Sequence, residues 1–247
     1  MSAWKGGGSR LLMEVATLLE PRIISCVAGA YPGERAHALD VMTARDVIRI
    51  TRSRACIIHI PRSPDKVPYS CIPMADFLAI FSPSTDIVPL INTSRAASSD
   101  EAIRMIYSGL RLLEEEAAFG YSALIKLEVL DDNLAIVADE VLKCVEALPE
   151  MLRERCIPYL PPDPRLVNAA CELGCPAVRI ASGQIGHRTG ILNPSAVRAA
   201  VEAASGVPTI LEGGLDSESD IEMSARIGAE AVSVSYTHLT LPTNREV

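Results

Sequence analysis

Short apolar runs alternate with longer amphipathic stretches along most of the chain. The short runs are rich in Val, Ile and Leu and predict strands at 23–27, 47–51, 87–92, 124–129, 156–159, 177–181, 209–212 and 231–234. Helical spacing of apolar residues predicts helices at 100–117, with Ser98 or Ser99 as the N-cap, and at 139–148, 164–173, 195–204 and 217–227. Repeated βα units with right-handed crossovers favour a TIM (β/α)8 barrel with its helices on the outside.

Two segments depart from this pattern. Residues 55–84 carry prolines among short apolar pieces, which predicts an irregular insertion, with room for a short extra strand. The run 234–243, Val-Ser-Tyr-Thr-His-Leu-Thr-Leu-Pro-Thr, matches the translation of a transposase-derived sequencing adapter. We therefore expect a single barrel domain over 1–232, a non-native tail over 233–247 and an incomplete eighth βα unit. The alternative is an ordinary disordered C-terminus, and resequencing the gene would decide between them.

Composition narrows the possible partners. A length of 247 residues fits one barrel, and a net charge of −8 argues against a nucleic-acid or anionic-membrane partner. No apolar run reaches the ~20 residues of a membrane helix, and the start lacks a signal-peptide pattern, so we expect a cytoplasmic protein. Seven cysteines without a paired framework suit a reducing compartment. Core thiols are expected, and no metal site.

The strand around Leu124 contains the strongest chemical signal. Side chains alternate across a strand, so Lys126 and Glu128 share one face. Burying a lysine is costly unless it is paired or has lost its proton. A neutral lysine amine can attack a carbonyl to form an imine, while a neighbouring carboxylate moves protons. The alternative is a purely structural Lys/Glu pair.

Two glycine-rich turns follow later strands and suit phosphate binding. One is Glu212-Gly213-Gly214, in which a carboxylate ends an apolar strand before a helix. The other is the loop 182–190, which contains Gly186. Glycines allow backbone N–H groups to approach a phosphate closely. Because active sites of βα barrels form at the carboxyl ends of strands, we expect both turns near Lys126.

The order of these motifs resembles the thiazole synthase family of thiamine biosynthesis. The similarity runs from about residue 23 to 232 and rests on several short matches in the family's order. These are Leu90-Ile91-Asn92-Thr93-Ser94, Ile125-Lys126-Leu127-Glu128-Val129, Ile157-Pro158-Tyr159, Asp163-Pro164, Gly174-Cys175, Ile185-Gly186, Gly190-Ile191, Val207-Pro208 and Glu212-Gly213-Gly214.

The resemblance implies an enzyme without a cofactor that joins 1-deoxy-D-xylulose 5-phosphate, dehydroglycine and sulfur from a carrier protein's thiocarboxylate into a thiazole phosphate. It implies that Lys126 forms the imine, that Glu128 and Glu212 move protons, and that Gly186, Gly213 and Gly214 hold the sugar phosphate. It also implies a homo-oligomer that docks the thiocarboxylated sulfur-carrier protein, and possible contact with a dehydroglycine-forming enzyme.

The chain departs from the family at three places. Glu212 stands where the family has Asp, and Arg179-Ile180-Ala181-Ser182 replaces Met-Pro-Leu-Gly, which puts an extra cation near the pocket. The family's phosphate-binding Asn-Thr falls on Ser235-Tyr236, within the suspect tail. Two other functions stay open: a different Schiff-base barrel acting on sugar phosphates, like an aldolase, and a non-catalytic barrel that binds a phosphate ligand.

Overall fold

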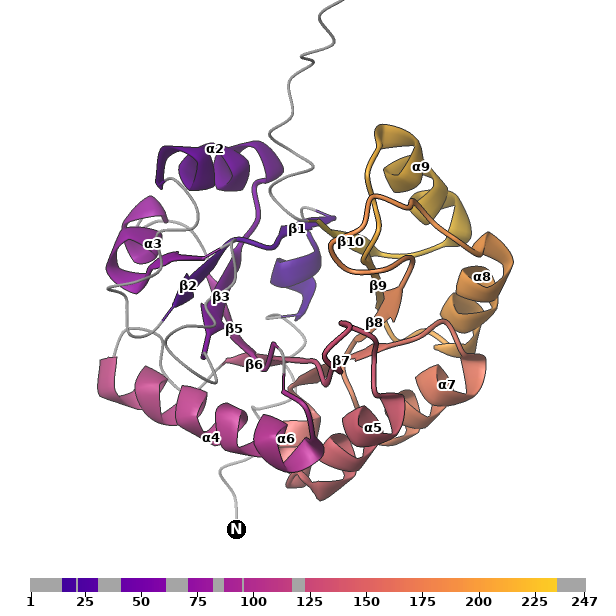
Figure 1. Ribbon diagram of the computed structural model, residues 1–247, viewed down its shortest axis with the longest axis horizontal. Helices are drawn as coiled ribbons and strands as arrows, with labels where there is room; N and C mark the ends of the chain where they lie inside the picture. Colours follow the sequence, from indigo (N-terminus) through magenta and orange to yellow (C-terminus); the bar gives the residue numbers. More distant parts are fainter. Residues whose placement is uncertain are drawn as a thin grey trace, which may run out of the picture.

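Parallel strands form a central barrel, and helices surround it (Figure 1). The computed structural model describes residues 15–20, 22–30, 41–60, 71–81, 87–94, 96–116 and 123–234. Its strands are β1 Ile23–Ser25, β2 Ala28–Ala30, β3 Ala55–His59, β4 Cys71–Pro73, β5 Val88–Asn92, β6 Leu124–Leu127, β7 Cys156–Leu160, β8 Val178–Ala181, β9 Thr209–Glu212 and β10 Ala231–Val234. They pair in the order β1-β10-β9-β8-β7-β6-β5-β3-β2-β4.

The ring closes through the first strand, which is split into two halves. β1 pairs with β10 in the register Ile23↔Val232, whereas β2 pairs with β3 in the register Ala28↔Ile57. Cys26 and Val27 join the two halves, so one stretch of chain links both ends of the sheet. β4 adds a short parallel strand beside β2. The predicted (β/α)8 barrel is therefore confirmed.

Helices follow most of the strands, as βα units require. They are α2 Val41–Thr51, α3 Met74–Ile80, α4 Ser99–Glu116, α5 Ala138–Ala147, α6 Glu150–Arg153, α7 Pro164–Glu172, α8 Pro194–Ala203 and α9 Glu218–Ile227. Capping residues fix where two of these helices begin. At α8, Asn193 accepts a hydrogen bond from Ala196 N, and at α9, Ser217 forms a capping box with Asp220. Gly228 ends α9 at φ +105°, a conformation that favours glycine. No helix among the described residues is long and apolar enough to cross a membrane.

Alternation along the strands divides the core into two layers. One cluster takes alternate residues from around the ring, together with Leu18 of the helical segment 15–19, and therefore fills the barrel interior: Ile24, Ala55, Ile57, Leu90, Leu124, Ile157, Ala177, Ile210 and Ala231. Another cluster takes the intervening residues, such as Ile125 and Leu127, and packs them against the helices. The apolar interior cluster thus forms a floor under the carboxyl ends of the strands.

Two of the predicted elements near the amino end are wrong. Residues 47–51, predicted as a strand, belong to helix α2, because the buried residues Ala44, Val47, Ile48 and Thr51 recur at helical rather than alternating spacing. The second barrel strand is instead β3, whose five residues are all buried. Residues 55–59 are therefore part of the barrel and not of an irregular insertion. The extra strand expected nearby is present as β4.

The remaining predicted strands lie where the pattern placed them, within one or two residues at their ends. Helix α4 begins at Ser99, and Ser98 caps it by accepting from the N–H of Glu101. Much of the proline-rich segment, 61–70 and 82–86, lies outside the described residues, as does the tail from Ser235 to Val247. The boundaries of a single domain and of a non-native tail stay predictions.

Candidate active site

Lys126 and Glu128 project into the barrel where β6 ends. Leu124, two residues before Lys126, belongs to the interior floor, so alternation directs Lys126 to the same side. Both charged residues are buried, with 5% and 4% of their surface exposed. Thr93, just after β5, fixes the backbone of Glu128 from the side: its hydroxyl donates to Glu128 O at 2.9 Å and accepts from Glu128 N at 2.8 Å. The strand end is therefore held rigidly.

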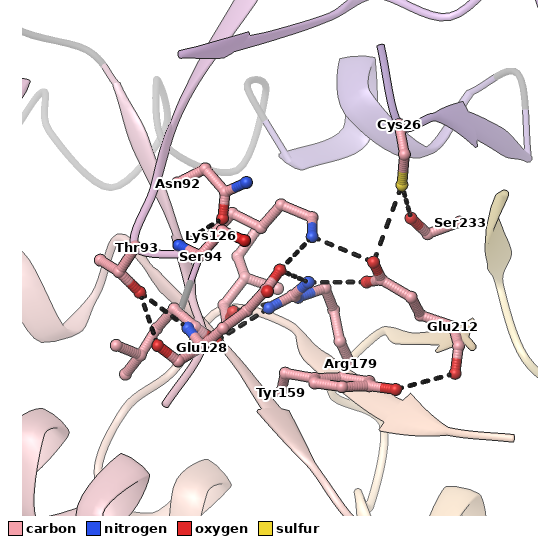
Figure 2. A network of polar contacts seen from close by, with 12 residues as sticks. Cys26, Asn92, Thr93, Ser94, Lys126, Glu128, Tyr159, Arg179, Glu212 and Ser233 are labelled. Carbon is pink, nitrogen blue, oxygen red and sulfur yellow. Dashed lines mark hydrogen bonds and ion pairs between the residues drawn. The ribbon is translucent and has the colours of Figure 1, made fainter. Parts of the chain in front are cut away.

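Glu212, at the end of β9, reaches the same point from the other side of the barrel (Figure 2). Lys126 Nζ donates to Glu212 Oε1 at 3.0 Å and also to Glu128 Oε1. The predicted convergence of Lys126, Glu128 and Glu212 is present in the structure. Their roles in a reaction stay predictions.

Arg179 on β8 supplies a second cation to this cluster. Its Nη1 donates to Glu128 Oε1 at 3.0 Å and to Glu212 Oε2 at 2.6 Å. Its Nη2 donates to Leu127 O at 2.8 Å, and its guanidinium lies 5.0 Å from the ring centroid of Tyr159. The side chain is fully buried. Two cations and two carboxylates therefore form a network in which each carboxylate contacts both cations.

The carboxylates control the protonation of the cluster. Burial alone would lower the pKa of Lys126, and Arg179 lowers it further, but contacts with Glu128 and Glu212 outweigh both, so this pKa lies above its ordinary value of 10.5. Burial opposes ionisation of Glu128, yet Lys126 and Arg179 prevail and lower its pKa to about 2. The pKa of Glu212 is lowered in the same way, despite burial, chiefly by Arg179. Lys126 is thus an ammonium while paired, which corrects the expectation of a neutral amine.

Cys26 and Ser233 border the cluster on the side where the ring closes. Cys26 Sγ lies 3.7 Å from Glu212 Oε1 and 3.0 Å from Ser233 Oγ. Burial, reinforced by the charge of Glu212, raises the pKa of Cys26 to about 11, so the thiol is protonated at neutral pH. Neither residue carried a signal in the sequence. Cys26 lies between β1 and β2, and Ser233 lies in β10, opposite Ile24 of β1.

The turn after β9 is packed against the loop after β8. Gly213 and Gly214 adopt φ values of +87° and +74°. A Cβ on Gly214 would come within 2.8 Å of Gly183 Cα, and one on Gly213 within 2.6 Å of Gly183 O. Gly186, in contrast, is exposed, with nothing within 4 Å of a Cβ built on it. Gly213 and Gly214 therefore pack against Gly183, a residue of the loop 182–190 that was not predicted to belong to the site.

Several hydrogen bonds donated by the loop 182–190 are accepted by carbonyl oxygens of the turn 212–214. Gly190 N donates to Gly214 O at 2.8 Å, and Ser182 Oγ donates to Gly213 O at 2.6 Å. Tyr159 Oη donates to Glu212 O at 3.3 Å. These bonds tie the glycine turn to the same strands that carry Arg179 and Glu212. A ligand that contacts the turn would therefore lie beside the acids.

A small cavity of about 10 Å³ lies between the charged cluster and the interior floor. Lys126, Arg179 and Ser233 line it from one side, with apolar residues such as Ile24 and Ile210 completing the wall. This volume corresponds to about one water molecule, so a substrate does not fit beneath the cluster. Any larger ligand must approach from the carboxyl ends of the strands.

Fold and cluster together define a TIM-barrel protein with a buried lysine held between two carboxylates at the carboxyl ends of its strands. Comparison with known protein families identifies the family. Residues 40–239 match the family model described as thiazole biosynthesis protein ThiG. The chain belongs to this family.

Individual relatives agree with the family match. The chain is 34% identical over 152 residues to a thiazole synthase of Prochlorococcus marinus (strain MIT 9301), covering 59% of this chain and 55% of that protein. It is 38% identical over 145 residues to a thiazole synthase of Shouchella clausii (strain KSM-K16), covering 58% and 52%. The chain thus spans about half the length of the curated relatives it matches.

A solved structure supports the fold. The crystal structure of the Amycolatopsis orientalis BexX/CysO complex contains a chain that superposes with a TM-score of 0.69 at 24% identity. The superposition covers 90% of this chain and 82% of that chain.

Proposed function

We propose that this chain is a thiazole synthase-like enzyme that condenses 1-deoxy-D-xylulose 5-phosphate with dehydroglycine and thiocarboxylate sulfur through an imine on Lys126. The observation that carries the proposal is the position of Lys126, which is buried at the carboxyl ends of the strands in contact with both Glu128 and Glu212. Membership of the thiazole biosynthesis family supports the overall reaction.

Imine formation begins with loss of the proton from Lys126. The amine nitrogen then bonds to the ketose carbonyl carbon, and the carbonyl oxygen leaves as water after accepting two protons. Glu128 and Glu212 both contact Nζ, so either can take the ammonium proton and pass it to the departing oxygen. Once formed, the protonated imine withdraws electrons from the neighbouring carbon, which prepares the next step.

The same acids can serve the next step. A protonated imine acidifies the adjacent C–H, and a carboxylate that removes this proton moves the carbonyl along the sugar before sulfur adds. Glu212 suits this task, since it contacts Lys126 through Oε1 and reaches its position from a different strand. Glu128 contacts the same ammonium nitrogen, and both carboxylates are held by Arg179, so either of them can take the proton from the carbon.

The glycine turn after Glu212 is the proposed site for the phosphate group. The carbonyl oxygens of Gly213 and Gly214 already accept hydrogen bonds from Ser182 and Gly190. The N–H groups of the turn would therefore be the ones that bind the phosphate. Positive φ values at Gly213 and Gly214 turn successive peptides in a way that suits anion binding. The sulfur donor would be a small carrier protein with a C-terminal thiocarboxylate. The fold neighbour from Amycolatopsis orientalis was itself crystallised with a second protein, CysO.

Borohydride trapping tests the proposal directly. Incubation with 1-deoxy-D-xylulose 5-phosphate and sodium borohydride should fix a secondary amine on Lys126, seen by mass spectrometry as one modified peptide. Lys126→Ala should abolish the adduct, whereas Lys143→Ala, which removes an exposed lysine of α5, should leave it unchanged. Absence of any adduct on Lys126 in the unaltered protein would refute the imine.

A second assay separates the proposal from an aldolase-like barrel. Supplying dehydroglycine and a thiocarboxylated carrier protein should yield a thiazole phosphate whose sulfur comes from the carrier. An aldolase-like enzyme would instead cleave or join a carbon–carbon bond of the sugar phosphate, without consuming the thiocarboxylate. A non-catalytic barrel would bind the sugar phosphate and give neither product.

A further inference from the structure

Arg179 occupies the centre of the charged cluster, in contact with both carboxylates that are proposed to move protons. Among the described residues, the charged and titratable groups facing Lys126 are Glu128 on its own strand end, Arg179 from β8, Glu212 from β9 and Cys26 from the first strand. Tyr159 from β7 lies under Arg179. Since Cys26 and Tyr159 stay protonated, the ionised members are two cations and two anions. The buried cluster is therefore electrically balanced.

This balance depends on Arg179 once Lys126 gives its proton to a carboxylate. With Arg179 present, the carboxylate that remains ionised keeps a contact of 2.6 Å, if it is Glu212, or 3.0 Å, if it is Glu128. Without Arg179, that carboxylate would be left buried and unpaired, which is strongly unfavourable. The proton would then stay on Lys126, and the amine could not attack a carbonyl.

We propose that Arg179 is a positioning residue that enables Lys126 to release its proton, by keeping a paired cation beside whichever of Glu128 and Glu212 stays ionised. Its geometry suits this role, because one nitrogen, Nη1, bridges both carboxylates while Nη2 is anchored on Leu127 O. The guanidinium group of Arg179 is thus held in place independently of Lys126. This inference deepens the proposed function, but the property it concerns is measurable without substrate.

The alternative is that Arg179 only fills and fastens the barrel interior. Its stacking on Tyr159 and its bonds to backbone carbonyls would serve such a role equally well. A structural role predicts that variants lose stability but leave the titration of Lys126 unchanged. A role in proton release predicts that the pKa of Lys126 rises when the positive charge of Arg179 is removed and falls again when a negative charge is removed with it.

Competitive labelling of Lys126 by acetic anhydride at a series of pH values measures this titration. The sequence contains four lysines, Lys5, Lys66, Lys126 and Lys143, so each can be followed on its own peptide by mass spectrometry. Arg179→Met, which removes the charge and keeps a long side chain, should raise the labelling midpoint of Lys126 by at least about one pH unit. Lys143, exposed on α5 and outside the cluster, serves as the internal control for labelling.

Three further variants separate charge from structure. Arg179→Lys keeps the charge and should give a midpoint close to that of the unaltered protein. The double variant Arg179→Met with Glu212→Gln removes one cation and one anion, and should also bring the midpoint back toward the original value. Arg179→Gln keeps hydrogen bonding without charge, so it provides the same test as Arg179→Met if that variant does not fold. A Lys126 midpoint that is the same in Arg179→Gln or Arg179→Met as in Arg179→Lys overturns the inference.

Trapping with the ketose phosphate distinguishes failure of this inference from failure of the proposed function. If the imine forms, its yield at pH 7.5 should fall at least about tenfold in Arg179→Met and recover as the pH is raised. Trapping on Lys126 with an unshifted midpoint would overturn the role of Arg179 while leaving the imine intact. A third outcome is a shifted midpoint in the Arg179 variants without any adduct in the unaltered protein. It would overturn the imine, while the effect of Arg179 on the protonation of Lys126 would stand.

Discussion

Glu128→Gln offers a quantitative test of the electrostatics of the cluster, through the pH dependence of stability. Glutamine keeps the shape of the side chain but cannot ionise. In the folded protein, Lys126 and Arg179 overcome the effect of burial and hold the pKa of Glu128 at about 2, compared with an ordinary value of 4.5. At about 1.4 kcal/mol per pH unit, the ionised carboxylate contributes about 3 kcal/mol to the free energy of unfolding at pH 7.

The sign of the pH dependence follows from the lowered pKa. Ionised Glu128 stabilises the folded state fully above about pH 4.5, and this contribution is lost as the pH falls through about 2. At pH 3, about 1 kcal/mol of it should remain. The difference in unfolding free energy between the unaltered protein and Glu128→Gln should therefore shrink from about 3 kcal/mol at pH 7 to about 1 kcal/mol at pH 3.

Urea unfolding followed by circular dichroism at pH 7, 5, 4 and 3 measures this difference. Glu222→Gln is the matched control, because Glu222 pairs with Arg226 on the exposed face of α9. An exposed pair of this kind contributes about 0.5 kcal/mol or less, so this control should show almost no effect at any of these pH values. A difference for Glu128→Gln that is constant from pH 7 to pH 3 would refute the assignment of an ionised Glu128 paired in the interior.

Two other predictions concern the turn after β9 and the thiol beside it. Gly214→Ala should cost more than about 2 kcal/mol in unfolding free energy, because its Cβ would lie 2.7 Å from Thr189 Oγ1 and 2.8 Å from Gly183 Cα. Gly186→Ala has a similar φ, +77°, but open space around it, so it should cost only about 1 kcal/mol; equal losses in thermal or urea unfolding would contradict the packing of the two loops. Cys26, whose pKa is raised to about 11 by burial and then by Glu212, should react with iodoacetamide at pH 8 at about a thousandth of its limiting rate. A midpoint near pH 8.5 in the labelling of its peptide would show that the thiol is not buried beside Glu212.

The sequence allowed the location of the site to be predicted, because strand ends in a parallel barrel meet at one rim. Lys126, Glu128 and Glu212 could be placed together from alternation and strand order alone. Arg179 could be predicted only as a cation near the pocket. Its contact with both carboxylates depends on the relative heights of β6, β8 and β9, and these heights are set by the pairing register.

The protonation of the lysine could not be predicted from one strand. A buried lysine considered alone should lose its proton, and burial does act in that direction. The result is reversed because two carboxylates converge on the nitrogen from separate strands. Likewise, Tyr159 was predicted only as part of a family motif, with no role in the site, whereas its ring lies against the guanidinium of Arg179 and its hydroxyl donates to Glu212 O.

The errors near the amino end have a local cause. The run Val47-Ile48-Arg49-Ile50-Thr51 is rich in β-branched residues, which favour strands, but the core contacts of α2 outweigh this preference. Prolines after β3 suggested irregular structure, yet the strand itself contains no proline and all five of its residues pair with β5. Local preference therefore failed where tertiary packing decided the outcome.

The split first strand also has a consequence for the order of assembly during synthesis. β1 obtains its neighbour only from β10, the last strand described, more than two hundred residues further along the chain. Until Val234 has left the ribosome, the edges of β1 and β9 remain open to solvent and to other chains. Because Cys26 and Ser233 meet only across this last pair of strands, the border of the charged cluster is completed when the barrel closes.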